Sequence, residues 1–201
     1  MPFKRRSTKP YYPVVRLMPL SLRSPETTSR APLMEPPPKA VIFDRDGVLI
    51  RDVGFPHRLD QLQWTDGALD LLRELRSRKV TVLVASNQSG VARGLFSTAD
   101  VDNFNEHLSA QARAAGGQID HIEYCPHLPT GTQAPFNTDC LCRKPKPGML
   151  HALIKRFSLD TNETVLIGDR DSDMLAASAV GVRGWLFTGG DLNHFFWGKC
   201  R

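Results

Sequence analysis

Short apolar runs recur between residues 39 and 187, and polar residues follow them. Ala40–Phe43 is a continuous apolar run that Asp44 ends, which predicts a short strand buried on both faces. Four further runs predict four more strands, at Val80–Ala85, Ile119–Tyr124, Thr164–Ile167 and Arg183–Phe187.

Helical patterns alternate with these strands. Leucines fall on one side of a predicted helix that opens at Asp66-Gly67. Ser97 or Thr98 can cap a second helix that reaches about Ala115, and the third and fourth are predicted at 147–157 and 172–180. The alternation predicts a doubly wound, mostly parallel, Rossmann-like α/β sheet with right-handed crossovers. Residues 188–201 are aromatic-rich, and we expect either a packed tail or a contact surface there.

Residues able to do chemistry come directly after the apolar runs. Asp44 and Asp46 follow the first run, Ser86 the second, Cys125 the third and Asp169 the fourth. Ligands of open α/β sheets bind beyond the carboxyl ends of the strands, so these side chains are predicted to meet at one edge.

The first of these sites, Asp44-Arg45-Asp46-Gly47, carries two carboxylates two residues apart. In an extended chain this spacing puts both on the same side, where they repel unless a cation or a proton is shared. Mg²⁺ is the natural counterion. One carboxylate can attack phosphorus while the other handles the proton. A turn with solvated aspartates is the alternative.

The fourth strand ends in a second acidic segment. Asp169 could bind Mg²⁺, and Asp173, one helical turn later, could hold a metal-bound water or a lysine. An acidic first helical turn is the alternative. That alternative explains Asp171 and Asp173 well and Asp169 poorly.

Two further segments suit a phosphoryl group. Residues 86–90, Ser-Asn-Gln-Ser-Gly, supply a hydroxyl, amides and backbone N–H groups. Lys144 could neutralise phosphoryl charge, and Arg143 could bind a second anionic group bidentately. Taken singly, such residues are more often an ordinary turn or a surface pair.

Three cysteines and a histidine have the spacing of a metal site. Cys125 and His127 are followed, after twelve residues, by Cys140 and Cys142, which predicts a closed Cys₃His site for structural Zn²⁺. Metal would supply the folding energy of the loop at 125–142. A disulfide is a poor alternative, because Cys140 and Cys142 are too close to pair comfortably. We expect Cys200 to be an ordinary exposed thiol.

Composition divides the chain. The formal net charge is +5 over 201 residues, but residues 1–38 hold seven basic and two acidic groups, with nine of the 15 prolines and none of the 15 glycines. We therefore expect a Pro-rich tail at 1–38 and a charge-balanced globular domain at 39–201. Three interpretations fit the tail: a solvated arm, a transit peptide, or an artefact of a translation start placed upstream of Met34. Prolines disfavour a transit helix, and we favour the upstream start.

The same features exclude some partners. No apolar run approaches about 18 residues, which argues against a membrane span. The balanced body, with no basic helix after the zinc ligands, argues against nucleic acid. Without a secretory segment we expect a cytoplasmic location, and we expect a monomer.

The motifs together resemble the haloacid dehalogenase superfamily over about residues 39–187. More narrowly, they resemble its family of D-glycero-D-manno-heptose 1,7-bisphosphate 7-phosphatases and histidinol-phosphatases. The resemblance is carried by Asp44–Gly47, Ser86–Gly94, Cys125–His127, Cys140–Leu150 and Gly168–Arg170.

The resemblance implies a Mg²⁺-dependent phosphatase of a small phosphosugar, preferably the heptose bisphosphate. Asp44 would be the nucleophile, and Asp46 would protonate the leaving oxygen, activate water and lend its carbonyl to Mg²⁺. Ser86 and Lys144 would stabilise the phosphoryl group, and Asp169 would bind Mg²⁺. The remaining substrate contacts would come from Asp52, Val53, Gly54, Phe55, Asn87, Gln88, Ser89, Arg143 and Arg170. The zinc loop would replace the cap domain of larger relatives.

The sequence departs from the family pattern at three positions. Val48 and Ser86 stand where threonine is common, and Arg170 stands where lysine is frequent. The alternatives are a histidinol-phosphatase or another small phosphomonoesterase, a zinc-stabilised binding module without catalysis, and a nucleic-acid-binding protein.

Overall fold

The computed structural model describes residues 37–200. Apart from Pro37 and Pro38, the predicted tail at 1–38 lies outside the described residues. Between residues 37 and 200, no helix combines the length and apolar character needed to cross a bilayer.

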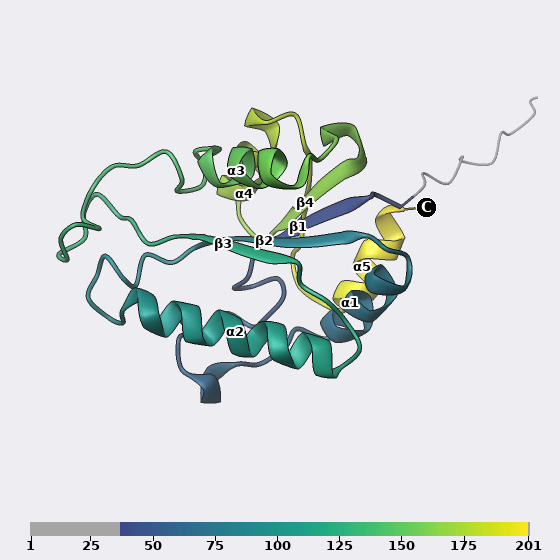
Figure 1. The fold of residues 1–201 in the computed structure, drawn as a ribbon, viewed down its shortest axis with the longest axis horizontal. Helices are drawn as coiled ribbons and strands as arrows, with labels where there is room; N and C mark the ends of the chain where they lie inside the picture. Colours follow the sequence, from purple (N-terminus) through teal and green to yellow (C-terminus); the bar gives the residue numbers. More distant parts are fainter. Residues whose placement is uncertain (1–36, 201) are drawn as a thin grey trace, which may run out of the picture. The chain divides into compact units, whose positions relative to one another are not determined.

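Five parallel strands form one sheet at the centre of the domain (Figure 1). Their order is β3-β2-β1-β4-β5, which confirms the predicted parallel α/β architecture. The order reverses beside β1, so the predicted ligand site lies beyond the ends of β1 and β4. The strands are β1 (Ala40–Phe43), β2 (Thr81–Asn87), β3 (His121–Cys125), β4 (Thr164–Gly168) and β5 (Arg183–Leu186).

Helices cover both faces of the sheet. One face packs against α1 (Ala68–Ser77), α2 (Thr98–Ala114) and α5 (Leu192–Lys199). The other face packs against α3 (Gly148–Phe157) and α4 (Asp171–Ala179). Two single 3₁₀ turns lie at Leu59–Gln61 and Thr161–Glu163.

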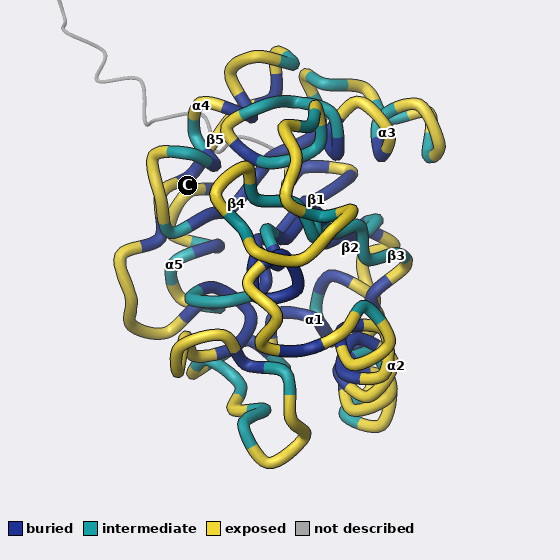
Figure 2. The backbone as a smooth tube through the Cα atoms, turned by 90° about the vertical axis from the view of Figure 1, so that its left-hand side faces the viewer, coloured by how far each residue is buried: buried dark blue, intermediate teal, exposed yellow. Residues whose placement is uncertain are grey.

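Strand residues alternate between the two cores. Val41 and Phe43 of β1 contribute to the core beneath α1, α2 and α5, whereas Ile42 contributes to the core beneath α3 and α4. Because both faces are covered, every residue of β1 is buried, which explains its unbroken apolar run. Figure 2 shows the buried strands at the centre and exposed positions recurring along α2.

The chain begins α2 where a capping signal was expected. Ser97 accepts a hydrogen bond from the Asp100 backbone N–H at 3.2 Å, and the Asp100 carboxylate accepts one from the Ser97 N–H at 2.8 Å. This reciprocal pair is a capping box. The predicted start of the helix is confirmed.

The C-terminal segment is a packed helix. Phe196 on α5 is fully buried, and its ring lies edge-on to Trp185 of β5 with 5.5 Å between centroids. Cys200, predicted to be exposed, is only 6% exposed. That prediction was wrong because α5 packs on α1 and carries the residue after it into the core.

Candidate active site

A cavity of about 520 Å³ opens at the carboxyl ends of the strands. Twelve predicted site residues line it: Asp44, Asp46, Asp52, Gly54, Phe55, Ser86, Asn87, Gln88, Ser89, Arg143, Lys144 and Arg170. Val53 does not line it, and 44% of its surface is exposed. Pro145, Ser172 and Asp173 also line the cavity, although the sequence did not mark them as substrate contacts.

Lys144 is the buried cation at the base of this cavity. Its Nζ lies 3.0 Å from Asp44 Oδ1 and 2.6 Å from Asp173 Oδ1, and it donates to the Ala85 carbonyl at 2.6 Å. The lysine joins the ends of β1 and β2 to the start of α4. The expectation that Asp173 could hold a lysine agrees with this geometry, and a helix-dipole role alone does not account for it.

Asn87 holds the backbone of Lys144 in place. The Asn87 amide donates to the Lys144 carbonyl and accepts from the Lys144 N–H, both at 3.0 Å. Asn87 also lines the cavity, and each end of its amide makes one hydrogen bond of this clamp. The residue therefore fixes the loop that carries Lys144.

Electrostatics in the buried cluster favour a further cation. Burial raises the pKa of Asp44 to about 7; Lys144 opposes this shift, and the carboxylates of Asp173 and Asp46 add to it. The pKa of Lys144 is raised above its usual value, because its two carboxylate neighbours outweigh the effect of burial. Two carboxylates around one ammonium leave a net negative site.

Asp169 supplies a third carboxylate beside this pair. Asp44, Asp169 and Asp173 each offer an oxygen within 4.8 Å of one another, and we name this set the carboxylate cluster. Asp169 Oδ1 is buried without a hydrogen-bond partner. Gly47, at φ +86°, lies so close that a Cβ there would clash with the Asp169 carboxylate. An orphaned buried oxygen in a negative site suits a hard cation such as Mg²⁺.

Asp46 lies outside the carboxylate cluster because its side chain is bound by Arg45 and Gln88. Arg45 Nε donates to Asp46 Oδ1 at 2.7 Å, and Gln88 Nε2 donates to Asp46 Oδ2 at 2.9 Å. Gln88 also donates to Ser86 Oγ at 2.8 Å. Sequence reasoning missed Arg45, whose position between two site aspartates was the one available signal.

The rim of the cavity is crossed by an ion pair. Arg170 Nη2 donates to Asp52 Oδ2 at 3.0 Å, and Arg170 Nε lies 3.6 Å from Asp169 Oδ2. Asp52 comes from the segment after β1, and Arg170 comes from the turn after β4. Phe55, on the same segment as Asp52, is 41% exposed, and Arg93 Cζ lies 5.7 Å from the centroid of its ring. These groups form an open, polar and aromatic rim.

The predicted zinc ligands converge in space, as the spacing requires. Their donor atoms lie within 4.8 Å of one another, and none of the cysteines forms a disulfide. Cys125 Sγ lies 3.6 Å from Cys140 Sγ and 3.2 Å from Cys142 Sγ, and His127 Nδ1 lies 3.3 Å from Cys142 Sγ. We name this set the thiol cluster. Three sulfurs and one imidazole nitrogen at such distances fit a tetrahedral zinc site.

The thiol cluster is connected to the cavity through Arg143. Arg143 follows Cys142 directly, lines the cavity and donates to the His127 carbonyl at 3.4 Å. Lys144 is the next residue. The loop that brings the zinc ligands together thus also presents both predicted phosphate-binding cations.

Known proteins share both the sequence and the fold. The family model described as HAD-hydrolase-like matches residues 141–194. The D-glycero-beta-D-manno-heptose-1,7-bisphosphate 7-phosphatase of Pasteurella multocida is 39% identical over 145 residues, which are 72% of this chain and 78% of that protein. The Escherichia coli K12 protein of the same name is 37% identical over 71% of this chain and 75% of its own length.

A solved structure also matches this chain in sequence and in fold. The crystal structure of D,D-heptose 1,7-bisphosphate phosphatase from B. bronchiseptica, complexed with magnesium and phosphate, is 33% identical and superposes with a TM-score of 0.67. The match covers 78% of this chain and 84% of that one. The chain therefore belongs to the heptose bisphosphate phosphatase family of haloacid dehalogenase-like hydrolases, and it is a phosphomonoesterase.

Proposed function

We propose that this phosphatase removes the 7-phosphate of D-glycero-β-D-manno-heptose 1,7-bisphosphate through an aspartyl-phosphate on Asp44. The observation that carries the mechanism is the placement of Asp44 against Lys144 at the base of a polar cavity. The choice of substrate rests on the two relatives named as 7-phosphatases of this bisphosphate, each matched over more than two thirds of its length.

The first half of the reaction transfers the phosphoryl group to the enzyme. An Asp44 carboxylate oxygen attacks phosphorus, and the bond between phosphorus and the sugar oxygen breaks. Asp46 donates its proton to that oxygen, so the sugar leaves as an alcohol. Lys144, with Ser86 beside it, stabilises the negative charge on the phosphoryl oxygens as the bonds exchange.

The second half returns the enzyme to its starting state. A water molecule attacks phosphorus and gives a proton to Asp46, and the bond from phosphorus to the Asp44 oxygen breaks. Inorganic phosphate is released, Asp44 is again a carboxylate and Asp46 again carries a proton. All atoms and charges are accounted for by the ester, one water and these two carboxyl groups.

Two metals fit the residues present. Asp44 and Asp169, with the backbone carbonyl of Asp46, would hold Mg²⁺, which supplies positive charge next to the phosphoryl oxygens when bound. The thiol cluster would hold structural Zn²⁺. At the rim, Arg143 and Arg170 are the cations available to the second phosphate of the substrate.

Phosphate release with matched substrates tests the assignment. The β-anomer of the heptose bisphosphate, the α-anomer and histidinol phosphate are compared by steady-state kcat/KM with added Mg²⁺. We expect the β-anomer to give the highest value. A far larger kcat/KM for histidinol phosphate would overturn the substrate assignment, and full activity of Asp44→Asn would overturn the mechanism.

A further inference from the structure

Arg45 is a buried charge that the proposed reaction does not use. Only 1% of its surface is exposed, although it lies between the two reacting aspartates. Burying a guanidinium costs free energy unless its donors are paired. The partners of Arg45 therefore show why a charged side chain is placed there.

Two of these partners are the oxygens of Asp46. Arg45 Nε donates to Asp46 Oδ1 at 2.7 Å, and Arg45 Nη2 donates to Asp46 Oδ2 at 3.1 Å. A planar fork that donates to both oxygens fixes the plane of the carboxylate as well as its distance. A lysine ammonium at this position would provide the charge but not the fork.

The rest of the guanidinium is held by other parts of the fold. Arg45 Nη1 donates to Asn105 Oδ1 on α2 at 3.0 Å, and the guanidinium carbon lies 4.7 Å from the ring centroid of Phe104. Asn105 is itself buried. A helix on one face of the sheet thus sets the orientation of the arginine.

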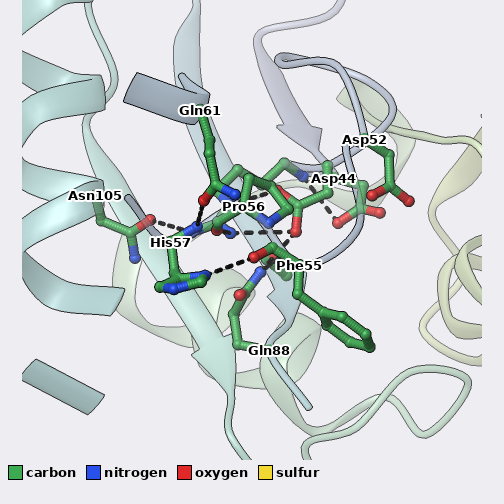
Figure 3. Close-up of polar contacts among 12 residues, drawn as sticks. Asp44, Asp52, Phe55, Pro56, His57, Gln61, Gln88 and Asn105 are labelled. Atoms are coloured by element: carbon green, nitrogen blue, oxygen red, sulfur yellow. Dashed lines mark hydrogen bonds and ion pairs between the residues drawn. The ribbon is translucent and has the colours of Figure 1, made fainter. Parts of the chain in front are cut away.

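Arg45 also contacts the segment at the rim. Its Nη2 donates to the Pro56 carbonyl at 2.9 Å, and Pro56 directly follows the cavity-lining residue Phe55. Figure 3 shows that Asn105, Pro56 and Gln88 lie close to one another. One side chain therefore contacts the carboxylate of Asp46, the rim segment and α2.

Gln88 and Arg45 differ in what they can offer Asp46. The amide of Gln88 can reverse and accept a hydrogen bond when Asp46 is protonated, whereas a guanidinium only donates. Asp46 must gain and lose a proton in each turnover of the proposed reaction. With the proton on Asp46 Oδ2, Gln88 can turn its amide to accept it, whereas Arg45 Nε keeps its bond to the unprotonated Oδ1. The bond from Arg45 Nη2 to Oδ2 belongs to the ionised state. Arg45 therefore holds the carboxyl group in both states through Oδ1.

We propose that Arg45, oriented by Asn105, is a positioning residue that aligns the Asp46 carboxyl with the leaving oxygen and joins it to the rim segment. The inference rests on the proposed function, because it gives Asp46 the acid and base role. It predicts that weakening the support slows protonation of the leaving group, while substrate binding changes little. Stability should fall by no more than the cost of one unpaired buried donor.

The test compares two substrates in Asn105→Ala, with Asn105→Asp as the conservative variant that keeps an acceptor for Arg45. Single-turnover rates are measured with the heptose bisphosphate, whose alkoxide needs a proton to leave, and with p-nitrophenyl phosphate, whose leaving group does not. We expect Asn105→Ala to slow the single-turnover reaction of the sugar by about tenfold and to leave the rate of p-nitrophenol release nearly unchanged. The steady-state KM for the sugar should also change little. Asn105→Asp should keep the rate on the sugar substrate close to that of the unsubstituted protein.

Arg45→Lys extends the test to the fork itself, with an expected loss of about 10²-fold on the sugar substrate. Asn193→Ala is the matched control, because Asn193 donates to Glu74 at 3.1 Å and does not line the cavity. Thermal unfolding of every variant monitors folding. If Arg45→Lys fails to fold, Asn105→Ala decides the question.

The outcomes separate the two proposals. Equal losses on both substrates, or no loss in Asn105→Ala, would overturn the positioning role while Asp44→Asn remains inactive. Activity in Asp44→Asn would instead overturn the proposed function.

Discussion

Two clusters of side chains that could hold metal ions lie near one cavity, and they are built differently. The carboxylate cluster takes its residues from the end of β1, the end of β4 and the first turn of α4. The thiol cluster takes Cys125 from the end of β3 and its other members from residues 126–147, a segment without helix or strand. The sheet positions the first cluster, whereas the second must position its own loop.

This difference suits the carboxylate cluster to the proposed reaction and the thiol cluster to a structural role. The carboxylate cluster is oxygen-rich, faces the cavity through Asp44 and Asp173, and keeps an oxygen of Asp169 unpaired. The thiol cluster directs all four ligands at one another and places none of them in the cavity lining. Loss of the first should remove activity and leave the fold intact, and loss of the second should act through the loop.

The sharpest test of this contrast is Asp44→Asn. We expect kcat to fall by at least about 10³-fold, because an amide is a far weaker nucleophile than a carboxylate. The unfolding free energy should be unchanged or higher, because one of three clustered carboxylates is lost. Phosphate release and chemical denaturation measure the two effects. A large loss of stability would show that the cluster also holds the fold together.

Lys144→Met should affect both properties. Removing the ammonium leaves Asp44 and Asp173 buried without their partner, so we expect a loss of about 3–5 kcal/mol in unfolding free energy. Activity should fall with it, since the phosphoryl charge loses its cation.

The double variant Lys144→Met/Asp173→Asn separates these two effects. It should regain part of the stability and none of the activity. If it regains the activity as well, Lys144 acts only as a structural counterion.

Cys142→Ser tests the thiol cluster. We expect zinc content to fall well below one per chain, because zinc binds thiolate far better than hydroxyl. Activity should drop by about 10- to 100-fold through displacement of Arg143 and Lys144, in the range seen when support of a site is lost. Metal analysis and phosphate release in excess Mg²⁺ provide the measurements.

Cys200→Ser is the matched control for that variant, because Cys200 is buried outside the thiol cluster. It should retain zinc and activity. A Cys142→Ser protein with full activity but no zinc would show that the loop does not need metal to place its cations.

The smallest effect is expected at the rim. Arg170→Ala removes a contact to Asp52 between exposed groups, so stability should change by less than about 1 kcal/mol. KM for the bisphosphate should rise by about tenfold if Arg170 binds substrate. Arg73→Ala, which breaks a comparable surface pair with Asp70, is the control and should leave KM unchanged.

The elements most visible in the sequence were those whose burial leaves a simple pattern. Ala40–Phe43 is apolar throughout because helices cover both faces of the sheet, and its predicted bounds match β1. The thiol cluster was visible because its four members are of metal-binding types and come as two closely spaced pairs along the chain. By contrast, α5 gave no usable period, because aromatic residues on several sides of it contact β5 and its neighbours.

The contacts that assemble the site were less visible. Lys144 could be named as a phosphate-binding cation, but its clamp by Asn87 joins residues 57 positions apart. The hydrogen bond from Arg45 to Asn105 spans 60 positions. Pairings of this kind depend on how α2 and the zinc loop pack on the sheet, and a single sequence contains no direct record of them.

The order of residues within the zinc loop sets where its length can vary. Cys142, Arg143 and Lys144 are consecutive, so one inserted residue would move a buried ammonium away from both carboxylates while the thiols stay in place. Residues 128–139 neither bind in the thiol cluster nor line the cavity. Within residues 128–139, Thr132 and Gln133 donate to the Ala92 carbonyl at 2.7 and 3.0 Å. A change of length there should therefore reduce activity less than a change between Cys142 and Lys144, which should abolish it.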